Sequence, residues 1–164
     1  MFRKLASAVV IGGAVAVGYV GGALATPGLG FTGVDMSKGR FEEFAVEAGN
    51  PEGNWVRLET RGPSDFYVVE NTVIPGGYSG WHTHPGPSLV TVKSGTATFF
   101  DGDDTTCNPR VYTEGAGFID RGDGHVHMVR NDGDTDLVLI TIQLFPAEIA
   151  PRRVDALDPG HCAM

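Results

Sequence analysis

The chain reads Gly-Trp-His-Thr-His-Pro-Gly-Pro over residues 80–87 and Gly-Asp-Gly-His-Val-His-Met-Val-Arg-Asn over residues 122–131. These two stretches hold four of the five histidines of the protein, arranged as two His-x-His pairs. In a β-strand, residues two apart point to the same face, so each pair can present two imidazoles in one direction. Two such strands side by side would bring three or four imidazoles together, an arrangement that binds Zn, Cu, Fe, Ni or Mn.

The composition limits the class of protein and of partner. The 164 residues suffice for one domain of ordinary size. The net charge is −8 and the sequence pI is near 4.9. A nucleic-acid-binding surface needs a basic stripe, so this composition argues against a nucleic-acid partner. The 24 glycines and 10 prolines favour many short strands joined by tight turns.

Short β-prone segments recur between these turns. Residues 55–60 alternate apolar and charged side chains, which predicts a half-buried strand, and residues 137–145 form the most apolar run. Residues 40–47 fit either a strand or a short helix, and residues 26–38 are expected to be an extended lead-in. Further strands are expected over residues 65–74, 79–84, 88–93, 96–100, 111–113, 118–120 and 125–131. About ten short strands without repeats or heptads predict an all-β sandwich or barrel.

The first 25 residues form a separate unit. Arg3 and Lys4 precede an uncharged stretch rich in Ala, Val and Gly, and Ala23-Leu24-Ala25 is an A-x-A cleavage signal. A cleaved signal peptide is favoured, with Thr26 as the first mature residue and no membrane contact after cleavage. The alternative is an uncleaved anchor, because about 20 apolar residues can span a bilayer. Both alternatives predict an exported protein, secreted or in the cell envelope.

Export changes the interpretation of the two cysteines, Cys107 and Cys162. Outside the cytosol, a single pair of cysteines favours a disulfide. Such a bond would close a loop of about 56 residues and contribute about 4 kcal/mol in the chain-entropy model. The alternative is two free thiols, with Cys162 on a frayed tail.

Residues 76–131 contain spacings that resemble the two motifs of the cupin superfamily. The first motif is a glycine, five residues, His-x-His, three or four residues, a glutamate, six residues and a glycine. The second ends in a Pro-x-Gly turn, two residues, a histidine, three residues and an asparagine. The matching residues are Gly76, His82, His84, Gly95, Gly124, His127 and Asn131. Ser88 stands at the glutamate position, and Gly122 replaces the proline.

The resemblance implies a double-stranded β-helix, the cupin jelly-roll barrel, with a metal near one open end. By the same resemblance, His82, His84 and His127 are three ligands of one divalent transition metal: Fe, Mn, Cu, Ni or Zn. The expected organisation is a signal segment over residues 1–25, a lead-in over 26–50, the cupin barrel over 51–146 and a C-terminal tail over 147–164.

The glutamate position leaves the ligand set open. Ser88 is a poor ligand, whereas His125 lies two residues before His127 and could share its inward face as a fourth ligand. The alternative is that the Asp123-Gly124 turn directs His125 outward. Four imidazoles would suit Cu or Zn, and three with open positions would suit Fe, Mn, Ni or Cu catalysis.

Two functions follow from these alternatives. The first is an exported, metal-dependent oxidoreductase, such as a dioxygenase, that acts on a small molecule. The second is a non-catalytic module that binds or sequesters a metal or a small ligand. The loss of the glutamate favours the second, because it removes an obvious general base. The expected partner is a small molecule, and a homodimer is one option for assembly.

Overall fold

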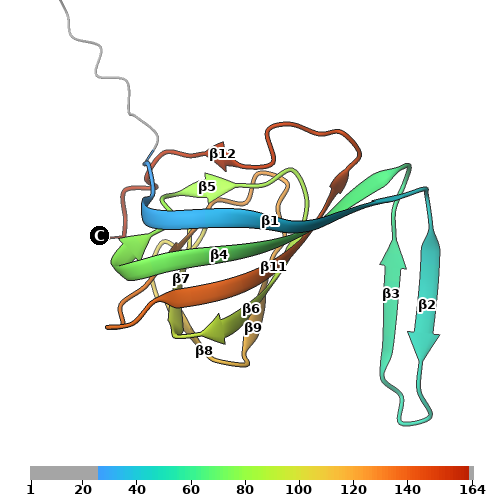
Figure 1. Ribbon diagram of the computed structural model, residues 1–164, viewed down its shortest axis with the longest axis horizontal. Coiled ribbons are helices and arrows are strands. Elements are labelled where there is room, and N and C mark those ends of the chain that lie inside the picture. The colour runs from blue at the N-terminus through green and yellow to red at the C-terminus, as the bar shows by residue number, and fades with distance from the viewer. Residues whose placement is uncertain (1–25, 163–164) are drawn as a thin grey trace, which may run out of the picture.

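The computed structural model describes residues 26–162, which form twelve strands and no helix within that range (Figure 1). The strands are β1 (Leu29–Phe41), β2 (Ala45–Gly49), β3 (Trp55–Glu59), β4 (Ser64–Tyr78), β5 (His82–Thr83), β6 (Ser88–Ser94), β7 (Thr96–Asp101), β8 (Arg110–Thr113), β9 (Gly117–Asp120), β10 (His127–Arg130), β11 (Leu137–Pro146) and β12 (Val154–Asp155). The signal segment predicted over residues 1–25 lies outside the described residues and stays a prediction. No helix in the described range is long and apolar enough to cross a membrane.

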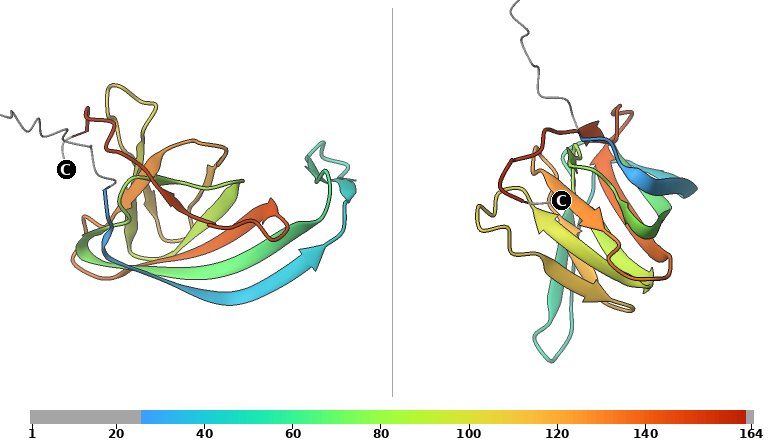
Figure 2. Two further views of the ribbon diagram at one scale, coloured as in Figure 1. Left: turned by 90° about the horizontal axis from the view of Figure 1, so that it is seen from above. Right: turned by 90° about the vertical axis from the view of Figure 1, so that its left-hand side faces the viewer.

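Ten of the strands form one antiparallel sheet that curls into a barrel (Figure 2). One side consists of β1, β4, β11, β6 and β9, and the other of β8, β7, β10, β5 and β12. The two sides are joined where Arg130 of β10 pairs with Tyr78 at the end of β4. The predicted all-β double-stranded β-helix is therefore confirmed.

The barrel is filled from both sides by alternating side chains, as the period of two requires. The main cluster of buried side chains comprises Val73, Val90, Val92, Ala97, Phe99, Val129, Leu137 and Leu139. A second cluster contains Trp81, Phe100, Met128 and Cys162, at the end of the barrel where the C-terminal tail crosses. The Ser94-Gly95 link between β6 and β7 depends on glycine, because Gly95 has a φ of 83° and lies against the backbone of Asp136.

Residues 29–41, which the sequence places in the lead-in, are a full strand of the barrel. β1 pairs with β4 from Leu29 to Phe41. The pairing is stabilised by Asp65 of β4, which is fully buried and forms ion pairs with Lys38 and Arg40 of β1. The pKa of Asp65 is lowered from its ordinary value of 3.8, chiefly by the hydrogen bond from Arg40 and then by the Glu148 backbone N–H.

Replacing Asp65 with Asn should destabilise the protein at neutral pH, because two cationic side chains lose their buried partner. The native pKa is depressed, so the contribution is complete above the ordinary pKa of the carboxyl and is lost as the pH falls towards the native value. Urea unfolding at pH 7 and at pH 3 should show a deficit that shrinks at the lower pH. The exposed-loop variant Asp134→Asn is the control, and an equal deficit at both pH values would contradict this account.

The contacts that tie the C-terminal tail to the rest of the protein include a strand pairing, a backbone hydrogen bond and a disulfide. β12 pairs with β5, the Thr26 backbone N–H donates to Ala156 O at 3.1 Å, and Cys107 and Cys162 form a disulfide. The predicted disulfide is therefore confirmed. It joins the loop after β7 to the end of the chain, so the tail is held across the end of the barrel where the histidines lie.

Replacing both cysteines with serine should lower the free energy of unfolding. The bond spans 55 residues of sequence, and closing a loop of that size contributes about 4 kcal/mol in the chain-entropy model. Urea unfolding of the oxidised protein and of the Cys107→Ser/Cys162→Ser variant measures the difference. Identical midpoints would show that the crosslink contributes nothing to stability.

Candidate metal centre

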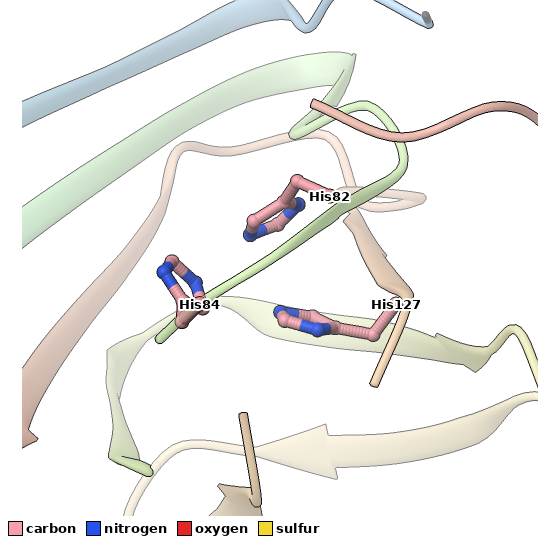
Figure 3. Close-up of side chains that lie close together, drawn as sticks. All are labelled: His82, His84 and His127. Atoms are coloured by element: carbon pink, nitrogen blue, oxygen red, sulfur yellow. The ribbon is translucent and has the colours of Figure 1, made fainter. Parts of the chain in front are cut away.

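Three of the four paired histidines converge at one end of the barrel (Figure 3). His82 on β5 is the cross-strand partner of His127 on β10, and His84 follows β5 directly. The ring centroids of His82 and His127 lie 4.2 Å apart, and one ligand atom from each of the three side chains falls within 4.8 Å of the others. The three ligands predicted from the sequence are thus brought together.

The turn that follows the first His-x-His pair contacts the turn that precedes the second pair. The backbone N–H of Asp123 donates to His84 O at 2.9 Å, and Gly122 lies against the backbone of Gly86. Gly122 has a φ of 67°, which proline cannot adopt because its ring fixes φ near −65°. The glycine at this position therefore permits the close approach that aligns the two motifs.

Backbone carbonyl groups orient two of the three imidazoles. His82 Nδ1 donates to Gly80 O, and His84 Nδ1 donates to Arg152 O, each at 2.8 Å. A carbonyl oxygen only accepts hydrogen bonds, so both rings carry their proton on Nδ1 and keep Nε2 as a lone-pair donor. This is the usual arrangement of metal-binding histidines, whose other ring nitrogen is held by a carbonyl or a carboxylate.

All three imidazoles are held in the neutral form that binds metals. Burial is the largest cause in each case: it lowers the pKa of His82 well below 6.5, lowers the pKa of His84, and lowers that of His127 to about 4. Metal binding competes with protons for these nitrogens. The donor set therefore fits a divalent transition metal, which the three side chains would hold through nitrogen alone.

His125, the candidate fourth ligand, is engaged elsewhere. Its Nδ1 lies 2.9 Å from Asp120 Oδ1, and its Nε2 lies 2.9 Å from Asp101 Oδ1. Ionised carboxylates only accept hydrogen bonds, so both ring nitrogens must donate and the ring is an imidazolium. Burial lowers the pKa of His125, but the hydrogen bonds to Asp120 and Asp101 outweigh burial and the net shift is upward from 6.5. A cationic ring has no lone pair for a metal.

Asp120 is a functional candidate that the sequence analysis did not identify. It ends β9, is 1% exposed, and its Oδ1 lies 3.3 Å from Nδ1 of His127. Its Oδ2 is buried without a hydrogen-bond partner in residues 26–162. The available signal was a single carboxylate at the end of an apolar strand, shortly before the second histidine pair.

Asp120 also places a carboxylate opposite Ser88, the residue that stands at the glutamate position of the first motif. Ser88 on β6 is the direct cross-strand partner of Asp120 on β9, and both residues line the same cavity. Ser88 is buried, and its hydroxyl has no partner in the described part of the chain. The negative charge next to the histidines therefore comes from the neighbouring strand.

The three histidines face a cavity of about 200 Å³ inside the barrel. Its apolar wall comes from both sides of the barrel, and its polar groups come from β1, β4, β11 and the C-terminal tail. The apolar lining consists of Phe31, Val69, Val90, Phe118, Val129 and Leu139, and the polar lining includes Asp35, Asn71, Thr141, Gln143, Arg152 and Arg153. A small, partly polar molecule fits a space of this kind.

Comparison with known proteins identifies the class. Residues 69–143, which include all three candidate ligands, match the family model described as a Cupin domain, so this part of the chain is a cupin domain. No curated protein matches the sequence significantly.

Solved structures with similar coordinates are related only distantly. A Klebsiella pneumoniae protein with a double-stranded β-helix domain is 24% identical, with a TM-score of 0.47 over 56% of this chain and 74% of that one. A cupin-like protein from Thermotoga maritima is 22% identical, with a TM-score of 0.49 over 57% and 65% of the two chains. Bacillus subtilis oxalate decarboxylase, studied for its Mn(II) centres, is 25% identical with a TM-score of 0.46, and the match covers 55% of this chain and 23% of the enzyme.

Replacing His84 with Ala should abolish stoichiometric metal binding, because two imidazoles alone hold a divalent ion weakly. Elemental analysis after dialysis against Co(II) or Zn(II) measures the metal per chain. His161, the one histidine outside the two pairs, gives the control variant His161→Ala, which should retain the metal. Full metal content in the His84→Ala protein would place the site elsewhere.

Replacing Asp120 with Asn should weaken metal binding by about 10- to 100-fold, because loss of a carboxylate that orients a ligand typically costs this much. Competition with a coloured chelator measures the affinity. Asp134→Asn is the matched control, since Asp134 is an exposed loop residue outside the candidate metal-binding groups. Equal affinities for the two variants would remove Asp120 from the site.

Proposed function

We propose that the protein binds one divalent transition metal through His82, His84 and His127 and converts a small molecule at that metal, with oxidation by dioxygen as the favoured reaction. One observation carries the proposal: Asp120 and Asp101 contact both ring nitrogens of His125, which leaves three histidine ligands that fill only part of a metal's coordination sphere. A bound ion with open positions polarises a substrate and, if it is Fe, Mn, Cu or Ni, gives access to electron transfer.

The residues of the chain perform the remaining tasks. The carbonyl groups of Gly80 and Arg152 fix the rings of His82 and His84, and Asp120 lies beside the ring of His127. The apolar wall of the cavity limits the access of water, which strengthens electrostatic interactions inside. The polar side chains of β4 and β11 are placed to orient a substrate through hydrogen bonds.

Binding of azide to the Co(II)-loaded protein tests whether coordination positions are open. Azide should change the visible spectrum, and it should do so equally in His125→Ala if His125 is not a ligand. Dioxygen uptake by protein loaded anaerobically with Fe(II), Mn(II), Cu(II) or Ni(II), offered small organic molecules, then tests the oxidation. A spectrum that does not respond to azide would exclude an open site and with it the proposed chemistry.

The second candidate is a non-catalytic module that binds a metal or a small ligand. Ser88 favours it, because a hydroxyl cannot serve as the general base that a glutamate at this position could provide. Metal bound tightly without any response to azide, together with no dioxygen uptake, would support this function.

We further propose that the protein works outside the cytosol. The segment over residues 1–25 and the disulfide both support export, because disulfides persist in oxidising compartments. N-terminal sequencing of the protein from its native cell should begin at Thr26. A chain that retains Met1 and sediments with membranes would support the anchor.

A further inference from the structure

The hairpin of β2 and β3, here called the arm, projects beyond the barrel (Figures 1 and 2). Every residue of its two strands is exposed. The half-buried strand predicted over residues 55–60 is therefore a strand, but no part of the described chain covers it.

The two faces of the arm differ in character. The register pairs Val46 with Leu58 and Ala48 with Val56, so one face is wholly apolar. The other face carries Arg57, which is ion-paired with Glu47 and Glu59. A two-stranded hairpin is marginally stable alone in water and needs a hydrophobic face packed against another element. The sequence of the arm thus requires a partner surface.

A second uncovered apolar surface lies on the outside of the barrel, here called the sheet face. Cross-strand pairs place Ile119, Leu89 and Ile142 in one row across β9, β6 and β11. These side chains are 67%, 44% and 41% exposed. Before Pro146, the outward positions of β11 are all aliphatic, namely Val138, Ile140, Ile142 and Leu144, whereas its inward positions include Thr141 and Gln143.

This pattern is the reverse of what a water-facing sheet requires. A strand with one solvated face alternates apolar and polar residues, and a near-continuous apolar run indicates a strand covered on both faces. The two surfaces are also continuous with each other. At the base of the arm, Phe41 packs against Phe66 of β4 with ring centroids 4.5 Å apart, and Phe44 lies 6.1 Å from Phe66.

We propose that the protein forms a two-fold dimer in which the arm of each copy packs its apolar face onto the sheet face of the other. Each chain carries both surfaces. In a two-fold dimer each arm therefore covers the sheet face of the partner, and no copy of either surface is left to recruit a third chain. The arm leaves the barrel at one end of the sheet and points away from it, so it does not cover the sheet face of its own chain (Figure 2).

The dimensions and the charge agree with a second copy as the occupant. Strands in a sheet lie about 4.8 Å apart, so the five-stranded side of the barrel is about 24 Å wide and the two-stranded arm about 10 Å wide, and the arm fits within the width of the sheet face. Residues 42–61 contain five glutamates and two arginines, a net charge of −3, which disfavours an anionic membrane as the alternative occupant.

Sedimentation velocity of the full chain tests the proposal. The wild-type protein should be a dimer at micromolar concentration. Val56→Glu/Leu58→Glu on the arm and Leu89→Glu/Ile119→Glu on the sheet face should each raise the dimer dissociation constant at least about 100-fold, because each buries unpaired charge. Val111→Glu is the control, since Val111 is equally exposed on β8 and belongs to neither surface. Unchanged metal content would show that the variants are folded.

A crosslinking experiment separates this arrangement from other dimers. Both native cysteines are in the disulfide, so an introduced cysteine is the one free thiol of each chain. Mixing Leu58→Cys protein with Leu89→Cys protein should give a crosslinked heterodimer. A monomeric wild-type chain, a dimer that resists both pairs of glutamates, or a dimer without this crosslink would each overturn the proposal.

Discussion

The pairing of β5 with β10 is the interaction on which the site depends. This pairing sets His82 opposite His127. The hydrogen bond from Asp123 N–H to His84 O joins the turn after the first histidine pair to the turn before the second. These two strands are short, so the pairing is supported from outside. β12 pairs with the other edge of β5, and the disulfide holds the end of that tail. Segments far apart in the sequence therefore share the task of positioning three side chains.

Charged groups surround one side of the centre. Three neutral imidazoles and the Asp120 carboxylate line the cavity, and the His125 imidazolium joins Asp120 to Asp101. A buried carboxylate is costly unless it is paired, and His125 provides that pairing. One histidine pair thus contributes two different functions: His127 faces the cavity as a neutral base, and His125 holds the carboxylate beside it.

Much of the fold could be predicted because its signals are local. Alternating side chains, turn residues and motif spacing predicted the barrel and three converging histidines, and a single pair of cysteines in a chain expected to be exported predicted the disulfide. Three features could not be predicted. β1 joins the barrel through the buried Asp65, the arm is exposed, and Asp120 stands opposite Ser88. Each depends on which strand lies beside which, and alternation within one strand does not contain that information.

The sequence by itself determined the all-β architecture, the two histidine pairs and the pair of cysteines, because residue type and spacing fix which side chains can share a face. Only the tertiary structure decided the role of each histidine. His125 lies two residues before His127, a spacing that in a strand would place both side chains on one face, yet two aspartates from other strands contact both of its ring nitrogens. The protonation state and the orientation of a side chain depend on the groups packed around it, and long-range strand pairing brings those groups together.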